Sequence, residues 1–308
     1  MKIFLSEINE NWIIDRLKNE WLDSNPTIST NKIKAADIVW IISPWMWNKI
    51  SRKYLKSKKV VCSIYHLEDS DFTKDGLKNF YKRDQYVDLY HVISNNTKKQ
   101  LQKITDKKII SIPFWLNQKI FYNINNTEEL KDKFNINNKA FVIGSFQRDT
   151  EGNDLISPKL IKGPDRLLEI YEYFHSLNEH TLILLSGKRR DYIINGLKNR
   201  NINYIYFEMV DFNTLNKLYN VLDLYIVASR IEGGPQAIME CAATKTPIIS
   251  TNVGVAPEIL SSESIFAMDN YKKAKPNINY AYKIVEKNFY TPFGFKNFEN
   301  MFKKLSNN

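Results

Sequence analysis

The sequence is poor in cysteine and has no long apolar run. Its 308 residues include two cysteines, Cys62 and Cys241, which are too few for a disulfide framework and suit a reducing compartment. No stretch approaches the roughly 18 apolar residues of a membrane-spanning helix. The apolar run of the N-terminal MKIFLSEINENWII is also too short for a secretory signal. We therefore expect a cytoplasmic protein in which both cysteines are small buried hydrophobic residues.

The chain is rich in residues that form hydrophobic cores. It is 43% hydrophobic and contains 17 Phe, 17 Tyr and 6 Trp, which excludes bulk disorder. Its length suits two domains better than one. The net charge is +10, and residues 1–135 hold 23 Lys and Arg against 16 Asp and Glu, so the excess lies mainly in the first half. A basic chain favours anionic partners, which leaves nucleic acid, nucleotide phosphates and an anionic membrane surface open.

Short apolar runs alternate with amphipathic stretches along the chain. Several runs are continuously apolar, which is typical of parallel strands covered by helices on both faces. The predicted strands are Lys2–Leu5, Ile38–Ile42, Val60–Ile64, Leu89–Ile93, Ile109–Ile112, Ala140–Gly144, Thr181–Ser186, Asn203–Phe207, Leu224–Ala228, Ile248–Ser250 and Ser264–Ala267. Helical periodicity lies between them, for example at Asp165–Phe174 and Thr214–Leu222. This pattern predicts an α/β fold with doubly wound sheets.

A polar, Asn-rich segment at Asn123–Lys139 interrupts this pattern and predicts an interdomain connection. A new series of strands and helices starts at Ala140. We predict an N-terminal Rossmann-like domain at residues 1–135 and a second one at residues 136–285. A C-terminal helix within residues 286–308 is expected to pack back on the first domain. Two such domains would face each other across a ligand cleft at the carboxyl ends of their strands.

A glycine turn between a strand and a helix is the most informative feature of the second half. Gly233 and Gly234 follow the predicted strand Leu224–Ala228, and they allow a sharp bend and close approach of a ligand. Pro235 is a favoured residue at the start of a helix, and Gln236–Ala243 is predicted to form that helix. Such a turn directs free amide groups and the positive end of the helix dipole toward a phosphate or a sugar hydroxyl.

Two acidic residues flank this turn. Glu232 precedes it, and Glu240 lies eight residues later within the predicted helix. Two carboxylates are a poor way to bind phosphate alone, whereas each can accept hydrogen bonds from a hydroxyl pair of a sugar or a ribose. Taken singly, both would more often be surface residues, so the interpretation depends on their combination with the turn.

This segment, SRIEGGPQAIMECAATKTPIISTNVGVAPEIL, resembles the donor site of the retaining glycosyltransferases of family 4, which have the two-domain GT-B fold. The family pattern is E-G-x-P, a second Glu, a Pro before a strand, and a late Gly and Glu. It falls here at Glu232, Gly233, Pro235, Glu240, Pro247, Gly254 and Glu258. The resemblance implies that Glu232 contacts the donor sugar and that Glu240 contacts the ribose of the nucleotide. It also implies that the turn from Gly233 to Gln236 faces the sugar and the phosphates.

A second match, at Phe141–Leu168, resembles the family's strand, Gly, Arg and Lys-Gly. Here Gly144 ends the strand, and the resemblance implies that Arg148 and Lys162 hold the donor diphosphate. Fixed cations then neutralise the departing diphosphate as a metal does in other enzymes, so no metal and no D-x-D metal motif is expected. An insertion between the two cations also makes Lys159 a competitor for the same role.

Further resemblance concerns the nucleobase and the first half. The segment YFEMVDFNTLNKLY resembles the part of the family that frames the base, so Met209, Val210 and Asp211 are candidates for base contacts. In the first half, VVCSIYHLED resembles the strand that ends in a His at the cleft. His66 is therefore a candidate for contact with the donor sugar or the acceptor, although a packing histidine would look the same. His91, inside an apolar run, is expected to be a packing residue.

The segment Pro44–Lys59 combines two Trp with many cations at helical spacing. An amphipathic helix packed on the sheet explains it. The alternative is contact with an anionic membrane surface. The residues that would make this contact are Trp45, Trp47, Lys49, Arg52 and Lys53.

Together these features predict a metal-independent retaining glycosyltransferase. Its donor would be a UDP- or GDP-linked nucleotide sugar, used as a co-substrate and not as a cofactor. Its acceptor would be a glycan, a lipid-linked molecule or a surface polysaccharide, met in the cytoplasm or at the inner face of the membrane. The alternatives are a nucleotide-sugar epimerase of the same fold, a non-catalytic nucleotide-sugar-binding protein, and a nucleic-acid-binding protein suggested by the charge. The last lacks a nucleic-acid-binding motif, and no nucleic-acid partner is expected.

Overall fold

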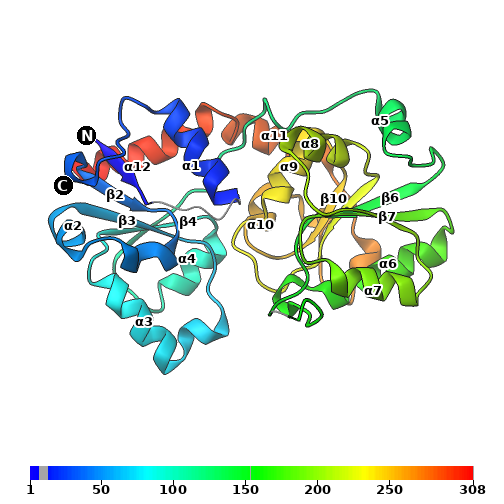
Figure 1. The fold of residues 1–308 in the computed structure, drawn as a ribbon, viewed down its shortest axis with the longest axis horizontal. Coiled ribbons are helices and arrows are strands. Elements are labelled where there is room, and N and C mark those ends of the chain that lie inside the picture. Colours follow the sequence, from blue (N-terminus) through cyan, green and yellow to red (C-terminus); the bar gives the residue numbers. More distant parts are fainter. Residues whose placement is uncertain (7–12, 153, 308) are drawn as a thin grey trace. The chain divides into compact units, whose positions relative to one another are not determined.

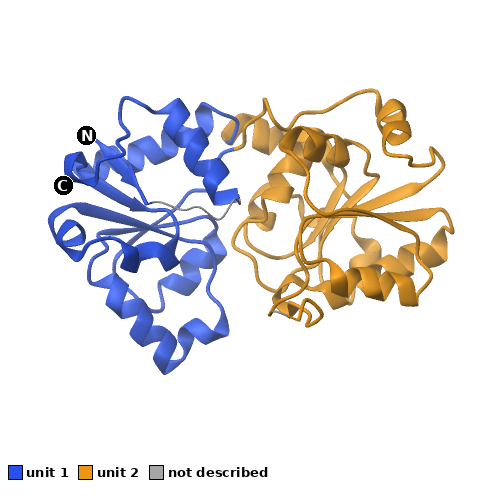
Figure 2. Cartoon of the chain, in the orientation of Figure 1, with its two compact units in different colours: residues 1–115, 289–308 blue, residues 116–288 orange. Residues whose placement is uncertain are grey.

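The computed structural model describes residues 1–6, 13–152 and 154–307. The chain forms two compact units (Figure 2): Met1–Trp115 with Phe289–Asn308, and Leu116–Asn288. Each unit contains one parallel sheet with helices on both faces (Figure 1). The predicted α/β fold of two Rossmann-like domains is therefore confirmed, and a strand is present at each of the eleven predicted places.

The first unit has five parallel strands in the order β1-β2-β3-β4-β5. The strands are β1 (Ile3–Leu5), β2 (Ile38–Ile41), β3 (Lys59–Ile64), β4 (Leu89–Val92) and β5 (Lys108–Ser111). The helices are α1 (Ile13–Ser24), α2 (Arg52–Ser57), α3 (Lys74–Asp84), α4 (Asn95–Leu101) and α12 (Lys296–Ser306).

The central strands of this sheet are buried on both faces. In β2, Ile38 and Trp40 belong to the core cluster beneath α1 and α12, whereas Val39 and Ile41 belong to the cluster beneath α3 and α4. Successive side chains of a strand point to opposite faces. A strand covered on both faces therefore favours apolar side chains at successive positions, which explains the continuous apolar runs.

The C-terminal helix α12 completes the first of these cores. The Phe298 ring lies among aromatic rings from residues 1–115. Its centroid is 4.9 Å from that of His91, 5.5 Å from that of Trp40 and 5.6 Å from that of Phe114. Phe298 is fully buried. The C-terminal segment from Phe289 therefore belongs to the first unit and contributes to its core, although it follows the second unit in sequence.

The histidine predicted to be a packing residue lies in this core. The His91 Nε2–H donates to the Ile112 carbonyl at 2.7 Å, and Nδ1 lies 2.9 Å from the Ser63 hydroxyl. The Trp40 indole N–H donates to the same hydroxyl at 2.9 Å. Burial lowers the pKa of His91 to about 4, so the ring is neutral at physiological pH. The packing interpretation of His91 is confirmed.

The segment Pro44–Lys59 is not the single helix that its spacing predicts. A 3₁₀ helix covers Pro44–Lys49, and after a break at Ile50 the short helix α2 follows. Trp47 and Leu55 pack into the core cluster beneath α3 and α4. The interpretation as a segment packed on the sheet therefore holds for these two side chains, whereas Trp45 is 49% exposed.

The second unit has six parallel strands in the order β11-β10-β9-β6-β7-β8. The strands are β6 (Phe141–Ser145), β7 (Thr181–Ser186), β8 (Tyr204–Phe207), β9 (Leu224–Val227), β10 (Ile248–Thr251) and β11 (Ile265–Phe266). The helices are α5 (Thr127–Lys133), α6 (Pro164–Leu177), α7 (Asp191–Asn199), α8 (Phe212–Asn220), α9 (Gln236–Thr244), α10 (Ala256–Ile259) and α11 (Ile278–Asn288). No helix in the described ranges is long and apolar enough to cross a membrane.

The compact units divide at Trp115, twenty residues before the boundary expected from the Asn-rich segment. Two side chains on α8 hold the connecting chain against the second unit. The Tyr122 amide donates to Asn216 Oδ1 at 3.1 Å, and the Ile124 amide donates to Asn220 Oδ1 at 2.7 Å. Asn216 and Asn220 are one helical turn apart, so they face the same segment. Each of these hydrogen bonds joins residues more than 90 positions apart in sequence. Local composition therefore does not reveal where the first unit ends and the second begins.

The order of strands in the second sheet determines where its loops converge. From β6 the chain continues outward to β7 and β8, and it then returns to the other side of β6 to form β9, β10 and β11. The carboxyl ends of β6 and β9 therefore lie at the point where the winding direction reverses. Parallel α/β sheets bind ligands at such a point, because the loops from the two adjacent strands diverge there.

Phe298→Ala is expected to lower the free energy of unfolding of the first unit by about 3–5 kcal/mol, because it opens a cavity in a dry aromatic core. Phe293→Ala is the matched control: Phe293 lies in the same C-terminal segment but is 57% exposed, and its loss should cost less than about 1 kcal/mol. Urea unfolding followed by tryptophan fluorescence measures both. Equal effects of the two variants would contradict the assignment of α12 to this core.

Candidate functional site

Two loops meet at the carboxyl ends of β6 and β9 through a close backbone contact. Gly163 has φ +65°, and a Cβ atom there would collide with the Ala228 carbonyl oxygen. Only glycine suits both the left-handed backbone and this proximity. The glycine of the Lys-Gly pair therefore brings Lys162, from the loop after β6, beside the loop that follows β9.

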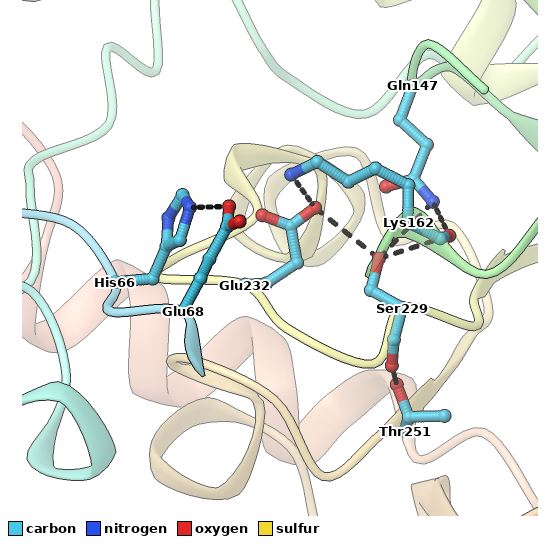
Figure 3. Close-up of polar contacts among 7 residues, drawn as sticks. All are labelled: His66, Glu68, Gln147, Lys162, Ser229, Glu232 and Thr251. Carbon is cyan, nitrogen blue, oxygen red and sulfur yellow. Dashed lines mark hydrogen bonds and ion pairs between the residues drawn. The ribbon is translucent and has the colours of Figure 1, made fainter. Parts of the chain in front are cut away.

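The two predicted residues Lys162 and Glu232 form an ion pair at this junction (Figure 3). Lys162 Nζ lies 2.5 Å from Glu232 Oε1, and the two side chains are 19% and 11% exposed. The Ser229 hydroxyl lies 3.4 Å from the same carboxylate oxygen. The side-chain amide of Gln147 donates from Nε2 to the Lys162 carbonyl at 3.0 Å. Because the pair is largely withdrawn from water, its attraction is stronger than that of an exposed pair.

A third loop, which follows β10, contacts the glycine turn and the residues before it. Gly254, in the loop after β10, has φ +50°, and a Cβ atom there would collide with the Gly233 carbonyl oxygen. The Thr251 hydroxyl donates to the Ser229 carbonyl at 2.7 Å. The late glycine of the sequence pattern is therefore required by a contact with the turn itself. Gly233 and Gly234 consequently have a defined position relative to Glu232.

The helix that follows the turn begins at Gln236, as predicted, and ends at Thr244, one residue after the predicted range Gln236–Ala243. Pro235 is the residue before the first turn of α9, and Gln236 is its first residue. In the next turn of α9, Glu240 is 5% exposed and accepts a hydrogen bond of 2.7 Å from the Tyr219 hydroxyl. The two predicted acids therefore have different partners: Glu232, in the loop after β9, pairs with Lys162, and Glu240 is buried on α9 against Tyr219.

The remaining predicted residues of this unit lie in different settings. Arg148 is half-buried in the loop after β6, and burial together with the charge of Arg189 lowers its pKa. Gly144 lies inside β6, where a Cβ would collide with the Leu222 side chain, so packing alone explains this glycine. The residues predicted to contact the base follow β8: Met209 is 58% exposed, Val210 is half-buried, and Asp211 caps α8 by accepting from the Thr214 amide at 2.7 Å.

Two Arg–Asp pairs that the sequence motifs do not include hold the loop between β6 and α6. Arg190 donates to Asp149 at 2.8 Å with both side chains at most 2% exposed, and it also donates to the carbonyls of Ser145 and Ser186. Arg230 forms a two-point pair with Asp165 at 2.6 and 2.8 Å, with both side chains about one-third exposed. Sequence reasoning missed them because neither pair is close in sequence.

Arg230 also binds the loop that carries Lys162. Its guanidinium donates to the Leu160 carbonyl at 2.8 Å, and its amide donates to the Ile161 carbonyl at 2.8 Å. Arg230 lies two residues before Glu232. The side chain therefore fixes the same two loops that the Lys162–Glu232 ion pair joins.

The candidate histidine of the first unit follows β3. His66 Nε2 lies 3.2 Å from Glu68 Oε1, and the two side chains are about one-third exposed (Figure 3). Glu68 begins a 3₁₀ helix in which its amide is capped by the Asp71 carboxylate at 2.8 Å. The Asp-Ser-Asp triplet at residues 69–71 is a D-x-D sequence, contrary to the expectation that the chain contains none, and its Asp71 carboxylate is engaged in this local cap. Within the described residues, no group of three His, Cys, Asp or Glu side chains is arranged to hold a metal ion.

The two Arg–Asp pairs differ in burial, which gives a matched test. Asp149→Ala should lower the free energy of unfolding of the second unit by about 3–5 kcal/mol, because it leaves the buried Arg190 charge uncompensated. Asp165→Ala removes the same carboxylate from a partly exposed pair and should cost about 0–1 kcal/mol. Urea unfolding measures both. If Asp165→Ala proves as costly as Asp149→Ala, burial is not what makes the Arg190–Asp149 pair important.

Solved structures with similar folds cover nearly the whole chain. The Anabaena protein HepE, solved in complex with UDP and glucose, is 12% identical, with 99% of this chain and 100% of that chain covered and a TM-score of 0.74. Sucrose-phosphate synthase from Thermosynechococcus elongatus is 12% identical, with 97% and 80% covered and a TM-score of 0.72. A glycosyltransferase from Rickettsia africae is 19% identical, with 97% and 84% covered and a TM-score of 0.64. At these identities the likeness establishes the fold, which is GT-B as predicted.

Comparison with sequence families gives a more specific result. No curated protein sequence matches the chain. The family model described as glycosyl transferases group 1 matches residues 126–286, more than half of the chain. The matched part includes β6, β9, the glycine turn and both residues of the Lys162–Glu232 ion pair. The chain therefore belongs to the glycosyl transferases group 1 family and is a GT-B glycosyltransferase.

Proposed function

We propose that the protein is a retaining glycosyltransferase of family 4 that transfers a sugar from a UDP- or GDP-linked donor without a metal ion. The observation that carries this proposal is the Lys162–Glu232 ion pair beside the glycine turn, at the point where the winding of the sheet reverses. A cation for phosphate and a carboxylate for hydroxyl groups are thus adjacent, next to the N-terminus of α9. A nucleotide sugar needs this combination of partners.

Donor binding would exchange the partners of this ion pair. The Lys162 ammonium would donate to a diphosphate oxygen in place of Glu232. The Glu232 carboxylate would then accept hydrogen bonds from the donor sugar. The positive charge of Lys162, with Arg148 as a second cation, would stabilise the diphosphate as it departs. Because a fixed ammonium supplies this charge, the proposed chemistry needs no metal.

The nucleotide itself is proposed from the ribose contact and from the similar folds. Glu240, whose carboxylate accepts a hydrogen bond from Tyr219, would also accept hydrogen bonds from the ribose hydroxyls. HepE has been solved with UDP-glucose, with 98% of this chain and 99% of that chain covered. This supports testing UDP-sugars first and GDP-sugars second.

Retention would follow if the acceptor hydroxyl attacks the face of the sugar from which the diphosphate departs. The C1–phosphate bond then breaks, the C1–acceptor oxygen bond forms, and the leaving phosphate oxygen takes the acceptor proton. The protein contributes positioning and charge stabilisation in such a reaction. His66 remains a candidate for contact with the sugar or the acceptor. We propose a glycan or a lipid-linked molecule as acceptor.

Lys162→Ala should weaken the binding of a UDP-sugar about 10- to 100-fold, because a hydrogen bond to a charged group is worth about 1.5–3 kcal/mol. Glu240→Ala should weaken it to a similar degree. Lys159→Ala is the matched comparison, since it removes a lysine from the same loop. Titration calorimetry with a panel of UDP- and GDP-sugars measures all three, and ¹H NMR of the product reports the anomeric configuration.

Several results would contradict the proposal. A loss with Lys159→Ala but none with Lys162→Ala would reassign the phosphate contact. Transfer abolished by EDTA would rule out metal independence, and an inverted anomer would rule out retention. A changed sugar configuration without transfer would identify an epimerase, and donor binding without transfer to any acceptor would identify a non-catalytic protein.

A lipid-linked acceptor would bring the protein to a membrane surface, and we propose Trp45, with the exposed Lys49, Arg52 and Lys53, as the contact. Trp45→Ala should reduce co-sedimentation with vesicles that contain anionic lipid several-fold. Tyr81→Ala is the control, because Tyr81 is an equally exposed aromatic residue of the same unit (50% against 49%). Equal sedimentation of Trp45→Ala and the unmodified protein would remove this contact.

A further inference from the structure

Tyr219 is the hydrogen-bond partner of the buried acid in the candidate donor site. It lies in the last turn of α8, is 2% exposed, and its hydroxyl donates to Glu240 Oε2 at 2.7 Å. Glu240 lies on a different element, α9. The bond therefore connects two helices that come from separate βα units, and no spacing in the sequence indicates it.

The ring of Tyr219 is explained by packing, but its hydroxyl is not. The ring lies in an aromatic cluster, with its centroid 4.9 Å from Phe146, 5.6 Å from Tyr225 and 6.0 Å from Phe121. A phenylalanine would fill this space equally well. A buried hydroxyl needs a polar partner, and here the partner is Glu240. Burial and the adjacent Glu240 charge raise the pKa of Tyr219 well above its usual value, so the hydroxyl stays protonated and donates.

Two threonines after Glu240 connect the two helices that carry this hydrogen bond. The Thr246 hydroxyl donates to the Tyr219 carbonyl at 2.8 Å. The Thr244 hydroxyl lies 2.7 Å from the Thr246 hydroxyl and 2.9 Å from the Glu240 carbonyl oxygen. The Thr-Lys-Thr segment at residues 244–246 therefore joins the C-terminal end of α9 to Tyr219 in the last turn of α8. This contact holds Tyr219 beside the helix that carries Glu240.

We propose that Tyr219 is a positioning residue that fixes the rotation of the Glu240 carboxylate for the two ribose hydroxyls of the nucleotide. In this way it makes the donor site select ribonucleotides over nucleotides that lack these hydroxyls. The proposal rests on the proposed function, which assigns the ribose contact to Glu240. A carboxylate with one oxygen held by a rigid donor cannot rotate away from the ligand. The conformational entropy of its orientation is therefore lost on folding and not on binding.

The test compares UDP with 2′,3′-dideoxy-UDP by titration calorimetry. The unmodified protein should bind UDP more tightly, because only UDP offers hydroxyls to Glu240. Tyr219→Phe should weaken UDP about tenfold or more, in the range expected for a hydrogen bond to a charged group. It should leave the affinity for 2′,3′-dideoxy-UDP unchanged. The ratio of the two affinities is the decisive quantity, since a general packing defect would weaken both nucleotides alike.

Two further variants control this comparison. Tyr171→Phe removes a hydroxyl from another fully buried tyrosine of the same unit, on α6, and should leave the ratio unchanged. In a Glu240→Ala background, Tyr219→Phe should have no additional effect on UDP binding, because the residue acts through Glu240. Thermal unfolding of each variant shows that it is folded at the temperature of the titration.

The outcomes separate this inference from the function on which it rests. If the unmodified protein binds neither UDP nor GDP, both proposals are overturned. If it binds GDP alone, the same comparison uses GDP and its 2′,3′-dideoxy analogue. If it binds nucleotide and Tyr219→Phe weakens both members of the pair equally, or neither, the positioning role is overturned and the donor site stands. A ratio that falls toward that of Glu240→Ala supports the role.

Discussion

The close contact between Gly163 and the Ala228 carbonyl is the constraint on which the candidate site depends. It sets the loop after β6 directly against the loop after β9, and this puts an ammonium and a carboxylate within ion-pair distance. Gly254 imposes a similar constraint on the glycine turn from the third loop. Polar side chains then act on a framework that is already assembled. In this site the glycines determine how closely the loops approach one another, and the charged residues determine which ligand groups the loops can bind.

The parallel sheet of the second unit explains why these loops, and their polar side chains, lie at the carboxyl ends of its strands. Its strands are parallel, and the central ones are largely buried on both faces, so their side chains form the core and polar groups gather in the loops at their carboxyl ends. Charges that do enter the interior are paired and hydrogen-bonded, as in Arg190 and Asp149. Without such partners, a buried charge would cost several kcal/mol. The same reasoning explains why Glu240, though almost inaccessible, has Tyr219 as a donor.

Much of the architecture follows from local patterns in the chain. Apolar runs, several of them continuous, predict a strand at each of the eleven places, because most positions of a strand covered on both faces are apolar. The glycine turn and Glu232 were also recognised from local sequence, and Lys162 from the family resemblance, since each belongs to a contiguous segment. The segment Pro44–Lys59 was interpreted as one helix, because helical spacing does not reveal the break at Ile50. The Asn216 and Asn220 contacts with the connecting segment, and both Arg–Asp pairs, join residues that are distant in sequence, and no local pattern records them.

The sequence by itself determined the fold class, the family and the residues that line the turn, because these depend on periodicity and on short motifs. Only the tertiary structure decided which of the many cations meets Glu232, which side chain holds Glu240, and where the chain passes from one unit to the other. These outcomes depend on the strand order of the sheet, which brings β6 beside β9 although eighty residues separate them. Adjacency in space is a property of the packed sheet. It arises from burial and backbone hydrogen bonding over the whole unit, and a local stretch of sequence does not contain it.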